Sequence, residues 1–204
     1  MKALVQRVTR ASVTVGEREV SAIGKGICVL LGISRDDSPK EAEWLATKLV
    51  NLRVFDDPET GKAWDKSVAD LGLEILCVSQ FTLCHVLKGN KPDFHNAMNS
   101  ELSKPAYENF LTLLRTKYRP DAVKGGEFGA YMQVHIQNDG PVTLHIESPK
   151  FPPPKERKAQ GGGGKGSKKG PAKDQSTSSD ADSSQQAKVD SAAESVAELT
   201  VGDS

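Results

Sequence analysis

The sequence feature that most constrains the fold is the dipeptide Gly140-Pro141, which stands between two runs that alternate apolar and polar residues, 128–137 and 142–147. Such alternation is typical of β-strands, so the runs predict two strands joined by a Gly-Pro turn. A hairpin usually closes on residues whose amides can bond across the turn, and proline has no amide and a fixed φ. One reason for proline here is a cis peptide bond that turns backbone carbonyls toward a ligand, because the cis form costs only about 0.5–1 kcal/mol before proline.

A second polar segment, Ser79-Gln80-Phe81-Thr82, lies near the end of an apolar run that predicts a strand over residues 73–83. A packed core requires neither this segment nor the Gly-Pro dipeptide, because buried polar groups cost free energy unless they are hydrogen-bonded. Both segments are therefore candidates for a functional role.

Further strands are predicted from periodicity. Residues 2–15 alternate, break at Gly16-Glu17-Arg18 and resume at residues 20–23, which predicts a hairpin. Residues 26–33 are continuously apolar, as in a strand buried on both faces. Residues 52–55 predict a short strand that ends in a turn.

Two helices are predicted between the strands. Ser38-Pro39-Lys40-Glu41 combines a capping serine, a proline in the first turn and a glutamate three residues after the cap. The second helix covers about residues 104–118, with Pro105 in its first turn, and residues 85–99 predict an irregular surface loop. Strands in hairpins with two inserted helices predict an α+β fold, whose mixed or largely antiparallel sheet curls into a partial barrel.

Composition divides the chain near residue 150. Residues 1–150 hold nearly all aromatic and branched apolar side chains, enough for one domain. Residues 151–204 contain a proline triplet, a run of four glycines and Ser-, Gln- and Ala-rich sequence, so they predict a disordered, low-complexity tail.

Charge within the tail is segregated. The block between Lys155 and Lys173 has seven basic residues and one acid, whereas residues 174–204 have seven acids and one base. A basic block in a flexible setting can bind the phosphates of DNA or RNA through counterion release. It can equally be a solvated tail that keeps the protein soluble, and the acidic half can mask the basic half.

The cysteines and histidines argue against a metal or a disulfide framework. Cys28, Cys77 and Cys84 are an odd number without CxxC spacing, which predicts buried thiols in a reducing compartment. The four histidines show no ligand spacing, and no glycine-rich phosphate loop follows a strand, so we expect no metal and no cofactor. Without a secretory or bilayer-spanning run, we expect a cytoplasmic protein with no membrane partner, and the basic block also allows a nuclear location.

No conventional nucleophile arrangement is evident. Cys84 and His85 are adjacent, but neighbours on a strand point to opposite faces, and there is no GxSxG motif. Thr82 is a better nucleophile candidate, yet strand alternation separates its hydroxyl from that of Ser79 and nothing supplies a base. Hydroxyls in a strand also serve in cross-strand hydrogen bonds, which remains the alternative.

The two polar segments together resemble the paired signatures of the D-aminoacyl-tRNA deacylases. The resemblance runs in register from residue 1 to about 149. It is carried by Ser79-Gln80-Phe81-Thr82-Leu83 and Asn138-Asp139-Gly140-Pro141-Val142-Thr143, with further matches at residues 5–13, 88–94 and 128–132. After Leu83 the bacterial pattern has Tyr-Ala-Asp, whereas this chain has Cys84-His85-Val86, so no role is assigned to these three positions.

The resemblance implies a homodimer that hydrolyses the ester of D-aminoacyl-tRNA, and of glycyl-tRNA, in pockets at the subunit interface. Gly140-Pro141 would be a cis dipeptide that rejects L-amino acids, reaching into the partner's pocket, and Arg7 would brace it. The resemblance also implies two sets of site residues. The reaction site would be lined by Ser79, Gln80, Phe81 and Thr82, and the substrate-binding set would comprise Gly140, Pro141, Arg7, Met132 (on the opposite wall) and Asn138.

Two questions stay open at the level of sequence. Catalysis could rely on the 2′-hydroxyl of the tRNA ribose with backbone amides near Phe81, or on Thr82 as a covalent nucleophile. The alternative function is a nucleic-acid-binding dimer that acts through the basic block of the tail.

Overall fold

The computed structural model describes residues 1–152 of the 204-residue chain. The predicted disordered tail, with its basic and acidic segments, lies outside the described residues apart from its first two positions.

A long strand, β1 (Lys2–Val15), organises the sheet. On one edge β1 pairs with β2 (Arg18–Ile23) through its second half and with β3 (Gly26–Gly32) through its first half, both antiparallel. On the other edge it pairs antiparallel with β8 (Gln133–Glu147) along nearly its whole length. The predicted β1–β2 hairpin and the doubly buried strand β3 are confirmed.

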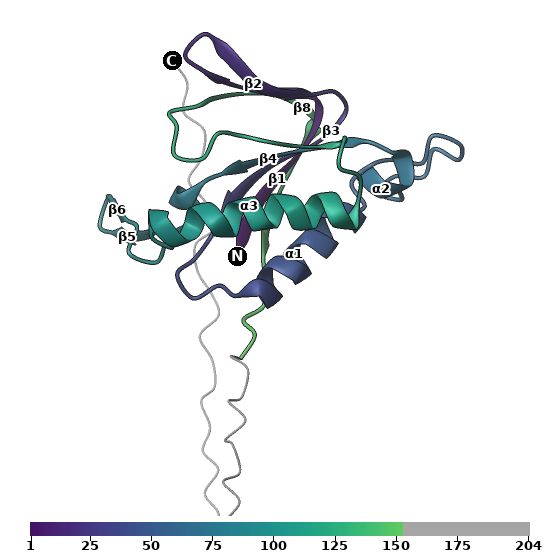
Figure 1. The fold of residues 1–204 in the computed structure, drawn as a ribbon. Helices are drawn as coiled ribbons and strands as arrows, with labels where there is room; N and C mark the ends of the chain where they lie inside the picture. Colours follow the sequence, from purple (N-terminus) through teal and green to yellow (C-terminus); the bar gives the residue numbers. More distant parts are fainter. Residues whose placement is uncertain (153–204) are drawn as a thin grey trace, which may run out of the picture. The chain divides into compact units, whose positions relative to one another are not determined.

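The sheet is mixed and curls on itself. Beyond β3, strands β4 (Glu74–Ser79) and β7 (Val123–Gly125) continue it in parallel. The Ser21 hydroxyl of β2 donates a hydrogen bond to the Gly125 carbonyl of β7 at 2.8 Å, so the first hairpin folds back over the far edge. Figure 1 shows this curled sheet above the helices, and the predicted α+β partial barrel is confirmed.

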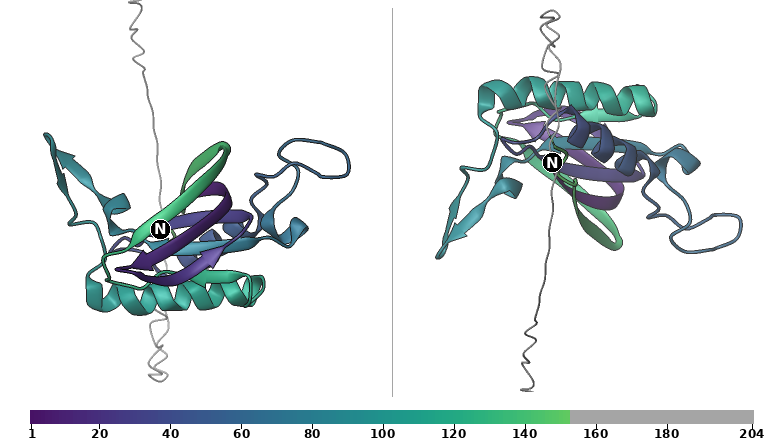
Figure 2. Two further views of the ribbon diagram at one scale, coloured as in Figure 1. Left: turned by 90° about the horizontal axis from the view of Figure 1, so that it is seen from above. Right: turned by 90° about the horizontal axis from the view of Figure 1, so that it is seen from below.

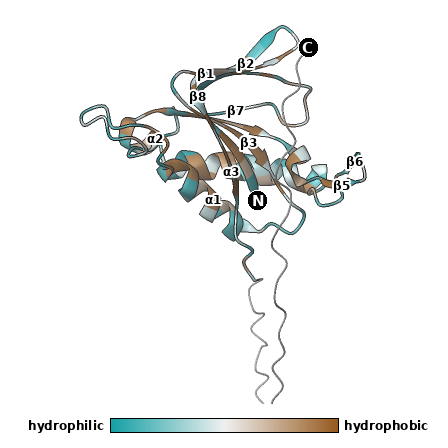
Figure 3. Ribbon diagram, turned by 180° about the vertical axis from the view of Figure 1, so that it is seen from behind, coloured by the Kyte–Doolittle hydropathy of each residue, from teal (hydrophilic) through white to brown (hydrophobic). Residues whose placement is uncertain are grey.

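Helices α1 (Pro39–Asn51) and α3 (Ser100–Lys117) lie side by side against the sheet, and a short helix α2 (Val68–Leu71) precedes β4 (Figure 1). The predicted start of α1 is confirmed, because Ser38 and Glu41 form a complete capping box. One apolar cluster fills the space between helices and sheet, and a second, containing Val8, Val13 and Leu76, fills the inside of the curl. Figure 3 shows the hydrophobic residues concentrated in the central strands, whereas the outer tips of hairpins and loops are hydrophilic.

The predicted hairpin at Gly140-Pro141 is wrong. Residues 133–147 form one strand, β8, which starts five residues later than the predicted run from residue 128 and whose two halves both pair with β1. The register passes from Asn138 opposite Val8 to Thr143 opposite Gln6, so four residues of β8 stand opposite Arg7 alone. Gly140-Pro141 therefore occupies a bulge on an edge strand.

Four other boundaries differ from the sequence prediction. The strand predicted over residues 73–83 ends at Ser79 and is followed by a 3-10 turn, η1 (Phe81–Cys84). Residues 52–55 contribute only an isolated bridge. The predicted irregular loop contains a hairpin of β5 (Val86–Lys88) and β6 (Lys91–Asp93), which projects from the opposite side of the body to the loop between α1 and α2 (Figure 2). Helix α3 starts at Ser100, so Pro105 lies inside it and not in its first turn.

Within residues 1–152, none of the helices is long and apolar enough to cross a bilayer.

Candidate active site

A pocket of about 580 Å³ opens where β4 ends. Its walls come from the end of β4, the 3-10 turn η1, the segment before α3, and the residues that lead into β8. Four of the predicted site residues line it: Ser79, Gln80, Phe81 and Met132.

The 3-10 turn is positioned by contacts with β3. The backbone amide of Gln80 donates to the Leu31 carbonyl at 2.7 Å, and at this point strand β4 ends and the turn begins. A Cβ on Gly32 would lie 2.9 Å from the Cβ of Leu83, so only glycine lets the turn pack this closely on β3. The Gln80 side-chain amide donates to the Thr82 hydroxyl at 2.5 Å. Thr82 is thus next to the pocket but held by its neighbour.

Aromatic side chains surround the pocket mouth. Phe81 is 58% exposed and packs edge-on against Phe94, with ring centroids 5.1 Å apart. Tyr131 also lines the pocket and is 90% exposed. Phe94 was part of a matching segment but received no role from the sequence, because a single phenylalanine in a predicted loop carries no positional signal.

The opposite wall depends on Tyr107 of α3. Its hydroxyl donates to the Cys77 carbonyl at 2.8 Å and accepts from the Gly126 amide at 3.0 Å, which ties β4 to the segment that carries Met132. Burial raises the pKa of Tyr107 well above its usual range, so the phenol remains a donor. Tyr107 lies on the buried, apolar face of α3 and received no role in the site from the sequence. A polar tip on an otherwise apolar stripe was the available signal.

No side-chain base bonds to the Thr82 hydroxyl among residues 1–152. His85 contacts the Thr82 backbone carbonyl through Nδ1 at 2.8 Å, and Cys84 is buried with its Sγ 3.5 Å from the Ser34 hydroxyl, so Cys84 and His85 do not form a dyad.

The remaining cysteines are as predicted. Cys28 and Cys77 are buried free thiols, and burial raises the pKa of Cys28 to about 12 and also raises the pKa of Cys77. Both are therefore poor nucleophiles. Residues 1–152 contain no group of three or more His, Cys, Asp or Glu side chains arranged to hold a metal ion.

The second candidate region is the bulge of β8. Its Gly140-Pro141 peptide bond is cis, and both residues are exposed. Asn138 closes the bulge, because its side-chain oxygen accepts from the Val142 amide at 2.7 Å and its amide donates to the Thr143 hydroxyl at 2.9 Å. Asn138 therefore acts within the bulge and does not reach the pocket.

Arg7 holds the bulge from behind. Its Nε donates to the Asp139 carbonyl at 3.0 Å, and its Nη1 donates to the Val54 carbonyl at 2.7 Å. The Asp139 carboxylate lies 3.5 Å from the same Nε. The planar fork of donors on one guanidinium thus joins two segments of backbone.

The structure separates the predicted site residues into two sets. The pocket set comprises four lining residues, Ser79, Gln80, Phe81 and Met132, together with Thr82, which is bonded to Gln80 beside the pocket. The bulge set comprises Arg7, Asn138, Gly140 and Pro141. None of the bulge set lines the pocket.

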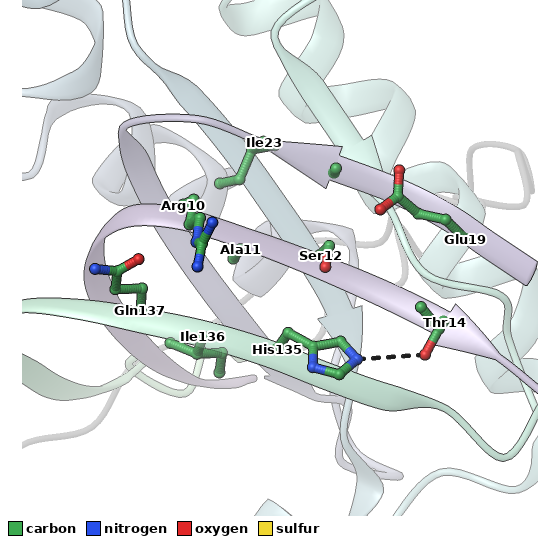
Figure 4. A pocket seen from close by; sticks show the side chains of 10 residues that line it. Arg10, Ala11, Ser12, Thr14, Glu19, Ile23, His135, Ile136 and Gln137 are labelled. Carbon is green, nitrogen blue, oxygen red and sulfur yellow. Dashed lines mark hydrogen bonds between the residues drawn. The ribbon is translucent and has the colours of Figure 1, made fainter. Parts of the chain in front are cut away.

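Another cavity, of about 800 Å³, lies between β1, β2 and β8 (Figure 4). Its polar lining includes Arg10, Glu19 and His135, and the His135 ring lies 3.4 Å from the Thr14 hydroxyl. It contains none of the predicted site residues, so volume alone does not identify the site.

Comparison with known proteins agrees with the paired signatures. A family model described as D-Tyr-tRNA(Tyr) deacylase matches residues 4–147. The chain is 66% identical to D-aminoacyl-tRNA deacylase 1 of Mus musculus over 149 residues, which cover 73% of this chain and 71% of the relative. It is 54% identical to D-aminoacyl-tRNA deacylase 1 of Danio rerio over 203 residues, which cover 97% of this chain and 96% of the relative.

Two solved structures are similar. One, described as c-Myc DNA Unwinding Element Binding Protein, has 65% identity and a TM-score of 0.71, covering 74% of this chain and all of that chain. The other, described as a "probable eukaryotic D-amino acid tRNA deacylase", has 18% identity and a TM-score of 0.61, covering 72% of this chain and 98% of that chain, and it supports the fold alone. The sequence-based family assignment is thus confirmed: the chain belongs to the D-aminoacyl-tRNA deacylases, hydrolases that act on aminoacylated tRNA.

Proposed function

We propose that the chain hydrolyses the ester between a D-amino acid and the 3′-terminal ribose of tRNA, and that it acts in the same way on glycine attached to a non-cognate tRNA. The products are the free amino acid and tRNA. Chirality is read by Gly140-Pro141. The observation that carries the proposal is the exposed bulge of β8, braced from behind by Arg7 and closed by Asn138.

Selection works by exclusion. The carbonyl oxygens of Gly140 and Pro141 accept hydrogen bonds from the amino group of the bound amino acid, and the missing Cβ of glycine permits close approach. A D side chain then points out of the pocket, whereas an L side chain runs into main chain. Such a filter tolerates many D side chains and does not exclude glycine.

A homodimer completes the site in this proposal. Within one chain the bulge set does not line the pocket. Among residues 1–152, β1 is the only strand that pairs with β8, so the other edge of β8 is available to a second copy. In a symmetric antiparallel pairing that brings Gly140 opposite the partner's Met132, the two-fold axis passes near Ile136.

The dimer has two tests. Sedimentation should show a dimer at micromolar concentration, and a monomer would contradict the proposal. In the register above, His135 lies opposite the partner's Gln137, so the double variant His135→Cys/Gln137→Cys should link two chains under mild oxidation. Failure of the link in a proven dimer would exclude this register while leaving the dimer intact.

The chemistry does not need a side-chain base. The 2′-hydroxyl beside the ester activates water, whose oxygen bonds to the ester carbonyl carbon. The bond to the ribose 3′-oxygen then breaks, and that oxygen takes up a proton. The amides of Phe81 and Thr82 are the first two of the 3-10 turn and have no acceptor within it, so they can donate to the oxygen that becomes negative.

Thr82→Ala separates this mechanism from covalent catalysis. The substrate-assisted reaction should keep at least about a tenth of its rate, whereas loss of a covalent nucleophile costs on the order of 10⁴-fold or more. Thr82→Ser, which retains the hydroxyl, is the matched control. Single-turnover release of D-tyrosine from D-Tyr-tRNA is the measurement.

Chirality is tested with the full-length chain on D-Tyr-tRNA, L-Tyr-tRNA and mischarged glycyl-tRNA. We expect release of D-tyrosine and glycine and no release of L-tyrosine above the spontaneous rate. Equal release of the two tyrosine enantiomers would refute the selection proposed for Gly140-Pro141.

A second candidate function is nucleic-acid binding through the basic block between Lys155 and Lys173. The observation in its favour is the concentration of seven basic residues in this block. The solved structure with 65% identity is described as c-Myc DNA Unwinding Element Binding Protein, but its whole chain matches 74% of this chain, so the description does not point to the tail in particular. Seven basic residues on phosphates would give a slope of log affinity against log salt of up to about −6. Deleting residues 155–173 should abolish this salt-dependent binding and leave ester hydrolysis intact. We propose the cytoplasm as the location of the deacylase, and the nucleus as a second location if the basic block binds DNA.

A further inference from the structure

Trp64, on the loop between α1 and α2, has an unusual backbone and surface position. It is the only non-glycine residue among 1–152 with a positive φ, at 58°, and it is 54% exposed. A bulky residue rarely adopts this left-handed conformation, and such conformations persist only where surrounding contacts hold them, often at functional positions.

Backbone contacts fix the loop that carries Trp64. The Trp64 amide donates to the Asp56 carboxylate at 3.3 Å. At the base of the loop, the Phe55 amide donates to the Lys66 carbonyl at 3.0 Å, and the Lys66 amide donates to the Phe55 carbonyl at 2.9 Å. The residue before Phe55 is Val54, whose carbonyl accepts from Arg7. One closed loop therefore presents both an anchor for Arg7 and the ring of Trp64.

The Trp64 ring covers the guanidinium of Arg7. The Arg7 Cζ lies 5.9 Å from the ring centroid, within the range of a cation–π contact. The same guanidinium donates to the Asp139 carbonyl, and a Cβ on Gly140 would lie 2.9 Å from its Nη2. Trp64, Arg7 and Gly140 thus form one continuous line of contacts, from an exposed ring to the tip of the bulge.

We propose that Trp64 is a positioning residue for chiral selection, which acts by holding Arg7 against the bulge. The inference rests on the proposed role of Gly140-Pro141 in rejecting L-amino acids. The ring keeps water from one face of the guanidinium of Arg7, whose side chain as a whole is only 15% exposed, so fewer waters compete for its donors. It also removes alternative rotamers in which Arg7 would release the Asp139 carbonyl.

Loss of this support should affect the two enantiomers differently. A filter that works by exclusion depends on rigid main chain, so a looser bulge lets an L side chain enter. A D side chain points out of the pocket, so the D ester depends on the bulge only through the hydrogen bonds of its amino group to the Gly140 and Pro141 carbonyls. We therefore expect faster hydrolysis of L-aminoacyl-tRNA with a much smaller change in the rate on the D ester. General destabilisation would instead lower both rates.

The experiment compares full-length variants on D-Tyr-tRNA and L-Tyr-tRNA. Trp64→Leu, which keeps an apolar side chain but loses the ring, should lower the D-to-L rate ratio about five- to tenfold through faster L hydrolysis. Trp64→Phe, which keeps a ring, should stay within about twofold of the wild type. Trp44 is the matched control, because Lys48 lies 5.5 Å from its ring on α1, and Trp44→Leu should leave the ratio unchanged. Equal ratios for Trp64→Leu and Trp44→Leu would overturn the inference.

Arg7→Met distinguishes failure of this inference from failure of the proposed function. If Arg7→Met lowers the ratio and Trp64→Leu does not, only the role of Trp64 is wrong. If neither variant changes the ratio, selection by the bulge is refuted together with the role of Trp64.

Fluorescence tests the contact itself. The chain has two tryptophans, so Trp44→Phe leaves Trp64 as the only indole. In that background Arg7→Met should change the emission of Trp64, and unchanged emission would overturn the contact.

Discussion

Gly126→Ala tests whether the wall that carries Met132 shapes the reaction site. A Cβ on Gly126 would lie 2.8 Å from the Met132 sulfur and 3.3 Å from a Val78 methyl. Ordinary contacts begin at 3.4 Å, so the sulfur must retreat by about 0.6 Å. Methionine is flexible, and we therefore expect a stability loss near the lower end of the usual 1–3 kcal/mol for overpacking, about 1 kcal/mol.

The neighbouring glycine provides a matched control. A Cβ on Gly125 would lie 2.7 Å from Leu111 Cδ1 and 3.1 Å from the Tyr107 hydroxyl. Leu111 and Tyr107 are 7% and 2% exposed in the core under α3, where little room exists for adjustment. The same added methyl should therefore cost more stability, about 2–3 kcal/mol, and it reaches the Met132 wall only indirectly, through the Tyr107 hydroxyl.

The assay combines single-turnover release of D-tyrosine from D-Tyr-tRNA with urea unfolding of each variant. Gly126→Ala should slow ester release about tenfold, since small misplacements of a positioning wall have large kinetic effects. Gly125→Ala should unfold at lower urea concentration than Gly126→Ala, yet slow ester release per folded molecule less than Gly126→Ala does, because it disturbs the wall only through Tyr107. A wild-type rate for Gly126→Ala, or a slower rate for Gly125→Ala than for Gly126→Ala, would refute the reasoning.

Two further predictions concern a helix cap and the bulge. Burial opposes ionisation of Glu41, but hydrogen bonds from Ser38 and the Phe151 amide outweigh it and lower its pKa to about 2. The pKa of a glutamate in the unfolded chain is about 4.3, so the ionised carboxylate stabilises the fold at neutral pH, and this stabilisation is lost as the pH falls from about 4 to about 2. In urea unfolding, Glu41→Gln should therefore cost up to about 3 kcal/mol at pH 7 and little at pH 2. An equal cost at both pH values would contradict this. Asn138→Ala leaves the Val142 amide without its acceptor, so it should lower the free energy of unfolding by about 1–2 kcal/mol and lower the D-to-L rate ratio. Asn138→Asp keeps the acceptor oxygen and should lose less on both measurements.

Elements set by local interactions could be predicted from the sequence. The start of α1 depends on side chains three residues apart, Ser38 and Glu41, which bond each other's backbone whatever the rest of the fold does. The continuous apolar run of β3 and the break at Gly16 in the first hairpin are equally local. These signals were sufficient for the α+β class and the order of the main elements.

The bulge of β8 could not be predicted in the same way. Two alternating runs around Gly140-Pro141 fit a hairpin and a bulged strand equally well, because both place the same residues on the same faces. The choice depends on β1, whose 14 residues are long enough to pair with both halves of β8. This information lies more than a hundred residues away in the sequence.

The end of β4 depends on another distant contact. Alternation alone continues the strand to Leu83, but the Gln80 amide bonds to the Leu31 carbonyl and Gly32 leaves room for the turn to pack on β3. The predicted alternation of Ser79, Gln80, Phe81 and Thr82 between two faces is therefore wrong, because three of them lie beyond the strand. The sequence could nominate candidate site residues, but not the geometry that presents them.

Separation of the pocket set from the bulge set gives the two sets distinct mutational consequences. In the proposed mechanism, a residue that supports the 3-10 turn or the Met132 wall acts where the ester is cut, so its loss should lower the rate on the accepted enantiomer. A residue that supports the bulge acts where the rejected enantiomer would be excluded, so its loss should raise the rate on the L ester instead. Tyr107, which ties β4 to the Gly126 segment, belongs by its contacts to the first group, and Arg7 belongs to the second. Measurement of both enantiomers therefore reports which wall a residue supports, which measurement of the D ester alone cannot do.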